Sequence, residues 1–117
     1  MTDPRTTETD PLGFSAHEAG AKLDAGKNRM GLVMMGFARA LAEVGAVGTF
    51  GAAKYTPHGW LSVPNGIERY TDAMFRHLVS EACGEVVDPQ TDIRHAAHTA
   101  WNALARLDLM LRQGEKS

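Results

Sequence analysis

The segment from about Asp92 to Leu111 constrains the fold most strongly, because its residues separate into two faces at the period of an α-helix. At about 100° per residue, one apolar stripe forms. Its members are Ile93, Ala97, Ala100, Leu104, Leu107 and Leu111. Almost opposite lie His95, His98 and Asn102, with alanines beside them and Arg106 at their edge. Short polar groups among alanines are not typical of a solvated face, so this row predicts either a ligand pocket or a subunit interface.

Two further helices are expected. From Met30, apolar residues recur at helical spacing as far as Val44. Gly45, Gly48 and Gly51 follow, so this helix either ends near Val44 or packs its later part closely on a neighbour. A second helix is predicted from about Ile67 to Cys83, with Gly84 placed to end it. Between these two, KYTPHGWLSVPNG is predicted to be a long loop because it contains two prolines and two glycines.

The expected fold class is therefore all-α. It is a small bundle of three main helices with a long loop before the second, and no segment alternates long enough to predict a strand. Residues 1–16 are expected to form a flexible N-terminal arm, and residues 17–117 a single helical domain. Thr91 or Asp92 is the expected N-cap of the last helix, and Cys83, Met34 and Met35 are expected in the core. A domain of 117 residues often supplements its core by self-association, so a homo-oligomer is expected.

Composition narrows the class of protein. A net charge of −2 gives no general attraction to a nucleic-acid polymer or to an anionic membrane. The single cysteine excludes an intrachain disulfide, and the N-terminus lacks the basic and apolar stretches of a signal peptide. We expect a cytoplasmic protein, in the host cytoplasm if the gene is a phage gene.

Candidate binding residues fall into three groups. Cationic side chains lie beside glycine-containing turns or on helix edges, where phosphate could approach the backbone. They are Lys22, Lys27, Arg29, Lys54, Arg69 and Arg76. Tyr55 and Trp60 sit on the irregular loop and could stack a base, or they could pin the loop to the core. The cations could equally be ordinary surface charges, and the GxxxxGK[ST] motif of phosphate-binding loops is absent.

The third group is the polar row, which His77 and Glu81 extend from the preceding helix. His95 and His98 with a facing carboxylate could bind a transition metal. Neutral imidazoles and Asn102 could instead hydrogen-bond phosphate or ribose oxygens. A satisfied polar network between packed helices is the third interpretation.

The blocks KLDAGKNR, FGAAKY, RYTDAMFRHL and HAAHTAWNAL, in this order and spacing, resemble the N-terminal domain of phage dATP/dGTP diphosphohydrolases over about residues 20–110. The resemblance implies hydrolysis of dATP or dGTP to the monophosphate and pyrophosphate. Positions that match the family pattern are Lys22, Asp24, Lys27, Arg29, Phe50, Gly51, Lys54, Tyr55, Trp60, Arg69, Arg76, His77, Glu85, Asp88, His95, His98 and Asn102.

Helical nucleotide pyrophosphohydrolases of the all-α type hold Mg²⁺ with an ExxE pair and an ExxD pair on successive helices, and this sequence has neither. The candidate metal ligands that remain are Glu81, Glu85 and Asp88, with Mg²⁺ or Mn²⁺ as the cofactor.

Three functions stay open. The first is a binding protein that needs no cofactor and holds a nucleotide between subunits, as a phage sponge for a host immune signal such as a cyclic ADP-ribose isomer or a cyclic dinucleotide. The second is a metal-dependent dATP/dGTP diphosphohydrolase, with His95 or His98 as the base. The third is an interaction protein whose histidine row is a plain dimer interface.

Overall fold

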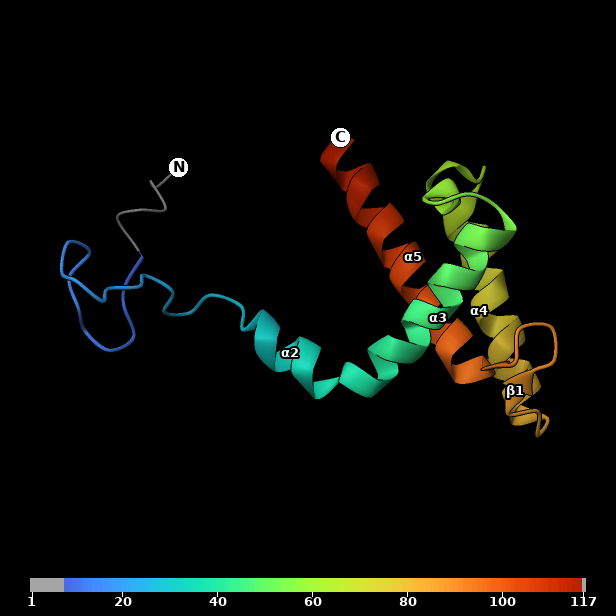
Figure 1. Ribbon diagram of the computed structural model, residues 1–117. Coiled ribbons are helices and arrows are strands. Elements are labelled where there is room, and N and C mark those ends of the chain that lie inside the picture. The colour runs from blue at the N-terminus through green and yellow to red at the C-terminus, as the bar shows by residue number, and fades with distance from the viewer. Residues whose placement is uncertain (1–7, 117) are drawn as a thin grey trace. The chain divides into compact units, whose positions relative to one another are not determined.

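The computed structural model describes residues 8–116, which form four α-helices, one 3-10 turn and a two-stranded sheet (Figure 1). The fold is mostly helical, as the sequence predicts. The chain divides into two compact units, Met1–Gly36 and Phe37–Ser117. The predicted boundary between arm and domain after residue 16 stays a prediction. Residues 1–7 of the predicted arm lie outside the described part of the chain.

In the first unit, Asp10 organises the described segment that precedes α2. Its carboxylate accepts hydrogen bonds from the backbone N–H of Leu12 (2.7 Å) and of Lys22 (2.6 Å). The hydrogen bond from Lys22 is the main reason that the pKa of Asp10 lies below its ordinary value. The backbone N–H of Ala25 donates to Thr9 (2.9 Å), so residues 9–10 are tied to residues 22–25.

The helix predicted from Met30 is two helices, α2 (Met30–Gly36) and α3 (Ala38–Lys54). Phe37, between them, has φ −104° and ψ 21°, outside the helical range. Every residue of α2 is exposed, so the prediction that Met34 and Met35 belong to the core was wrong. No single helix in the described residues is long and apolar enough to cross a membrane; α2 and α3 reach that length and composition only when taken together across the break.

In the second unit, α3 continues through Gly45, Gly48 and Gly51 because it packs closely on a neighbour, the second of the two alternatives that the sequence left open. A Cβ at Gly48 would lie 3.3 Å from Nε1 of Trp101 on α5 (His95–Lys116). A glycine at this position lets the α3 backbone approach the indole ring.

The loop before α4 (Gly66–Ala82) contains a 3-10 turn, η1 (Gly59–Ser62). Trp60 of η1 meets Trp101 edge-on with ring centroids 6.0 Å apart, and Tyr70 of α4 meets the same indole at 5.6 Å. The Tyr70 hydroxyl donates to the backbone oxygen of Trp60 (2.8 Å). These three rings join the loop, α4 and α5. Of the two interpretations of Trp60, the structure shows the one in which it pins the loop.

A short hairpin connects α4 to α5. Its strands, β1 (Val87–Asp88) and β2 (Ile93–Arg94), are antiparallel, with Val87 opposite Arg94 and Asp88 opposite Ile93. Asp92 adopts a left-handed conformation (φ 59°) in the turn. The prediction of an N-cap at Thr91 or Asp92 was therefore wrong, because these residues belong to the hairpin and α5 begins at His95.

The structure covers the polar row of the last helix, as predicted, and leaves part of the apolar stripe exposed. The polar residues His95, His98 and Asn102 are buried. The buried apolar residues in the described part of the chain are small: Val47, Ala97 and Ala105. Leu104 and Leu107 of the apolar stripe remain about half exposed, at 52% each. Cys83, predicted in the core, is exposed at the end of α4, because the chain leaves the helix there.

We expect Gly48→Leu to lower the free energy of unfolding by about 1–3 kcal/mol, because the added side chain must displace Trp101 from the aromatic cluster. Gly45→Leu is the matched control, since nothing lies within 4 Å of a Cβ at that position of the same helix. Urea unfolding followed by tryptophan fluorescence measures both. Equal stability of the two variants would contradict the close approach of α3 to Trp101.

Candidate functional site

Six polar side chains meet where α4, the hairpin and α5 come together; we refer to them as the histidine cluster. They are His77 of α4, Glu85, Asp88 of β1, Thr91 of the hairpin turn, and His95 and His98 of α5. Asn102 closes the cluster on the α5 side by donating to the backbone oxygen of His98 (2.8 Å).

Local chain geometry explains why these residues meet. His95 and His98 are three residues apart on α5 and therefore share one helix face, which packs against α4. Gly84 adopts a positive φ (98°) after α4, and the chain then turns back through the hairpin. The backbone N–H of His95 donates to the oxygen of Val86 (3.0 Å), which brings residues 85–88 beside the start of α5.

Hydrogen bonds fix the orientation of the three rings. His95 Nε2–H donates to Glu85 Oε1 (2.6 Å), and a nitrogen-to-nitrogen hydrogen bond of 2.8 Å joins His95 Nδ1 to His77 Nδ1. Because the carboxylate can only accept, a neutral His95 presents a lone pair at Nδ1, and His77 Nδ1 is then the donor. Thr91 Oγ1 shares a hydrogen bond of 2.7 Å with His98 Nε2. The rings of His77 and His98 stack at 4.5 Å with an angle of 8° between their planes.

Asp88 brings a carboxylate to both stacked histidines. Its Oδ2 lies 3.9 Å from His77 Nδ1 and 3.9 Å from His98 Nε2. One ligand atom of His77, one of Asp88 and one of His98 all lie within 4.8 Å of one another. Ligands bound about 2.1 Å from a tetrahedral metal are separated by about 3.4 Å, so a small inward movement would suffice to bind an ion.

The donors of this group fit a divalent transition metal. Two imidazole nitrogens and one carboxylate oxygen suit Zn²⁺, Co²⁺ or Mn²⁺ better than Mg²⁺, which prefers oxygen ligands. His95 would support the site from outside, because Glu85 holds its ring as carboxylates commonly hold histidines near metals. An ion bound at His77 Nδ1 would replace the hydrogen that this atom shares with His95.

Burial favours the neutral form of His77 and of His98. It is the main cause that lowers the pKa of His77 below the ordinary value of 6.5, and positive charge on His98 and His95 lowers it further, against the opposing effect of Asp88. Burial likewise lowers the pKa of His98, where Asp88 opposes the shift and His95 reinforces it. A neutral imidazole has a lone pair for a metal, so both shifts favour metal binding near neutral pH.

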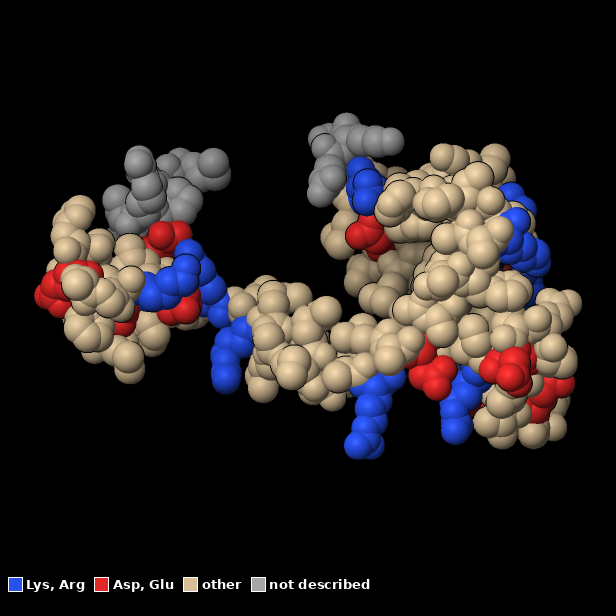
Figure 2. Space-filling model, in the orientation of Figure 1, with Lys and Arg blue, Asp and Glu red and all other residues tan. Residues whose placement is uncertain are grey.

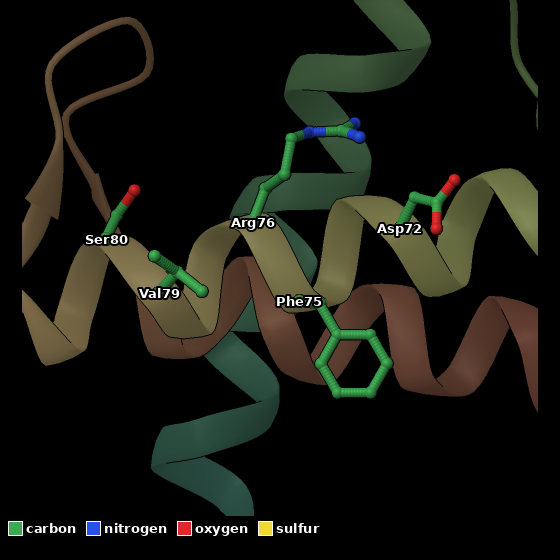
Figure 3. Close-up of a pocket in the computed structure, with 5 residues that line it drawn as sticks. All are labelled: Asp72, Phe75, Arg76, Val79 and Ser80. Carbon is green, nitrogen blue, oxygen red and sulfur yellow. The ribbon is translucent and has the colours of Figure 1, made fainter.

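Arg76 brings a positive charge close to the cluster, near enough to depress the pKa of its neighbour His77. It lines a shallow hollow on α4 with Asp72, Phe75, Val79 and Ser80 (Figure 3). Figure 3 shows Arg76 and Ser80 projecting from the same side of α4. A guanidinium and a hydroxyl on one helix face can both donate to phosphate oxygens.

The other predicted ligand-binding residues of the second unit lie elsewhere. The Arg69 side chain donates to the backbone oxygen of Pro64 (3.4 Å), and the Lys54 ammonium lies 5.2 Å from the centre of the exposed Tyr55 ring. Trp60 belongs to the aromatic cluster around Trp101.

Lys22, Lys27 and Arg29 belong to the first unit, where Lys27 pairs with Glu8 (3.1 Å). Together with Lys54, Tyr55, Trp60 and Arg69, these residues stay predictions as ligand contacts.

The three predicted metal ligands have different surroundings. Asp88 joins His77 and His98, Glu85 bonds to His95, and Glu81 is exposed at the end of α4. Sequence reasoning missed Thr91 as the partner of His98. The only signal for it was its hydroxyl in the turn before the histidine row, and that signal was interpreted as a helix cap.

Because His77 and His98 take up protons less readily in the folded than in the unfolded chain, acid should destabilise the metal-free protein. The contribution of these groups to stability is complete above pH 6.5 and is lost as the pH falls through their depressed folded-state pKa values. We expect the free energy of unfolding, measured in urea, to decrease below pH 6.5. We also expect His77→Gln to flatten this dependence and His17→Gln, at an exposed position, to leave it unchanged. An identical slope in His77→Gln would contradict the assignment.

Comparison with known families places this arrangement in context. A family model described as "dATP/dGTP diphosphohydrolase, N-terminal" matches residues 17–117, which include the whole histidine cluster. Neither a search of curated proteins nor a search of solved structures finds a match. The matched range covers most of the chain and confirms the resemblance seen in the sequence blocks. The chain therefore belongs to the dATP/dGTP diphosphohydrolase N-terminal domain family.

Proposed function

We propose that this chain hydrolyses purine deoxynucleoside triphosphates to the monophosphate and pyrophosphate, with a divalent transition metal held in the histidine cluster. The observation that carries the proposal is the convergence of His77, Asp88 and His98, whose ligand atoms lie within 4.8 Å of one another. Family membership supports the substrate class, since the family description names dATP and dGTP.

The residues of the chain would divide the work as follows. His77, Asp88 and His98 hold the metal, whose charge would offset that of the phosphates and favour ionisation of a bound water. Arg76, exposed beside His77, donates to phosphate oxygens. His95 and Glu85 share a hydrogen bond and form an acid–base pair beside the proposed metal ligands. Glu85 is half exposed and can pass a proton to solvent.

Sequestration of a nucleotide is the second candidate, and one observation favours it. Within residues 8–116, the metal-capable group contains a single carboxylate, whereas the all-α pyrophosphohydrolases use four. A site with few carboxylates repels phosphate less, and it could hold a ligand without turnover. The ligand would then be a host nucleotide signal, such as a cyclic ADP-ribose isomer or a cyclic dinucleotide, in contact with exposed cations such as Arg76.

The two candidates separate in one experiment. Chelator-treated full-length protein is incubated with dATP, dGTP or dTTP and with Mn²⁺, Co²⁺, Zn²⁺ or Mg²⁺, and products are analysed by mass spectrometry before and after denaturation. Hydrolysis predicts monophosphate and pyrophosphate well beyond one equivalent from the purine substrates. Sequestration predicts intact nucleotide that is released only on denaturation. If no metal gives turnover and no nucleotide is released on denaturation, both candidates are contradicted.

We expect Asp88→Asn to reduce turnover by about 100-fold or more, because an amide is a much poorer metal ligand than a carboxylate. Asp108→Asn is the matched control: it makes the same chemical change on α5, where Asp108 pairs only with the exposed Arg112. Circular dichroism checks that both variants fold. Full activity in Asp88→Asn would remove Asp88 from the proposed site.

A further inference from the structure

The exposed face of α5 has no function in the proposed site, yet it is apolar along its whole length. Leu104, Leu107 and Leu111 are each more than half exposed, and Ala96, near the start of the helix, is exposed as well. At 100° per residue these positions, with Ala100 and Ala103, fall within an arc of about 100°. No charged residue lies in this arc. In Figure 2, charged side chains mark the C-terminal end of α5, and uncharged surface follows along its visible side.

Within the second unit, no other element covers the leucines of this face. The second unit buries small apolar residues only, and no large side chain in residues 8–116 is fully buried. The side of α5 that packs on α4 is the polar one, with the buried His95, His98 and Asn102. The most apolar surface of the helix is thus the surface that the second unit leaves exposed, and such a surface marks a protein contact.

The order of residue sizes along the face identifies the contact. The first half carries Ala96, Ala100 and Ala103, and the second half carries Leu104, Leu107 and Leu111. When two copies of the helix pack antiparallel about a two-fold axis between residues 103 and 104, Ala96 faces Leu111, Ala100 faces Leu107, and Ala103 faces Leu104. Every large side chain then meets a small one, which is the condition for close packing without voids. A parallel pair would place leucine against leucine and alanine against alanine.

A stable interface buries about 800 Å² on each partner, so residues beyond α5 would also have to take part. Arg106 of α5 donates to the Thr71 hydroxyl (2.9 Å), which locates this edge of α4 beside α5. Phe75 lies one turn further along α4, near the same side, and is 55% exposed. Figure 3 shows its ring projecting away from the α4 backbone. The face spans about 22 Å of α5, from residue 96 to residue 111.

We infer that this face binds a second copy of the chain through an antiparallel, two-fold contact between the two α5 helices. Such a contact is isologous, so it closes at two subunits and uses the same residues on both. The inference does not depend on the proposed hydrolase, because none of the residues in the face belongs to the histidine cluster.

Sedimentation equilibrium of the full-length protein tests the contact. We expect a mass of about twice 12.6 kDa for the wild type, and we expect Leu107→Glu to raise the dissociation constant by about 100-fold, because the contact would bury an unpaired charge. Leu12→Glu, at a residue that is 84% exposed in the first unit, is the control and should stay dimeric. A monomeric wild type, or an unchanged Leu107→Glu dimer, overturns the inference. Nucleotide hydrolysis, measured in parallel, reports separately on the proposed function.

Residue exchange tests the pairing of large with small side chains. Ala96→Leu and Leu111→Ala, at two exposed positions, should each weaken the dimer, since one creates a steric conflict and the other a void. The double variant should restore it, because leucine at 96 then faces alanine at 111. Additive weakening in the double variant would overturn the proposed register.

Cross-linking tests the antiparallel direction. In a Cys83→Ser background, Leu104→Cys places a thiol beside the two-fold axis, whereas Leu111→Cys places the two thiols about 22 Å apart along the axis of the helix pair. A short bismaleimide should therefore join two Leu104→Cys chains and leave Leu111→Cys chains unlinked. Efficient linking of Leu111→Cys alone would show a parallel pair and contradict the inference.

Discussion

A hydrogen-bonded network of polar side chains and the aromatic contact of Tyr70 with Trp101 join α4 to α5, whose described residues bury few large apolar side chains. His77 and His95 share a hydrogen bond, His95 also bonds to Glu85, and His98 bonds to Thr91. In the described part of the chain, every buried side-chain nitrogen or oxygen has a partner. Leaving one such group unpaired costs about 1–3 kcal/mol, so the network fixes one register of the two helices and places the hairpin beside them. Because losing a partner is costly, the network also holds its side chains in one arrangement, as a metal site requires.

How much of this the sequence could predict differs from one element to the next. The helical class, the loop before α4 and the family follow from periodicity, from turn residues and from the order of blocks. The covered polar row on α5 was also predicted, and burial of His95, His98 and Asn102 confirms that it is covered. Periodicity gives two faces of a helix but not which face the chain itself covers. The pattern therefore did not show that Leu104 and Leu107 of the apolar stripe would stay about half exposed.

The candidate site shows the same limit. Histidine spacing on one helix can be read from the sequence, and so can the acidic residues of the linker. Which carboxylate meets which histidine depends on the hairpin, whose two-residue strands give no alternating pattern to detect. The structure brings Asp88 to His77 and His98 and gives Glu85 to His95. These separate positions support different proposed roles: Asp88 as a metal ligand, and Glu85 as the group that orients His95. Burial lowers the pKa of His77 and of His98, so the same packing that joins the helix pair favours imidazoles with a free lone pair.

The most direct test of the metal site is an NMR titration of the full-length protein with Mn²⁺, with the five histidine rings labelled with ¹⁵N. The account predicts that substoichiometric Mn²⁺ broadens the ring signals of His77, His95 and His98, while those of His17 and His58 stay sharp. Equal broadening of all five rings, or none at one equivalent of metal, would contradict a metal site in the histidine cluster, and the proposed hydrolysis at that site would fall with it.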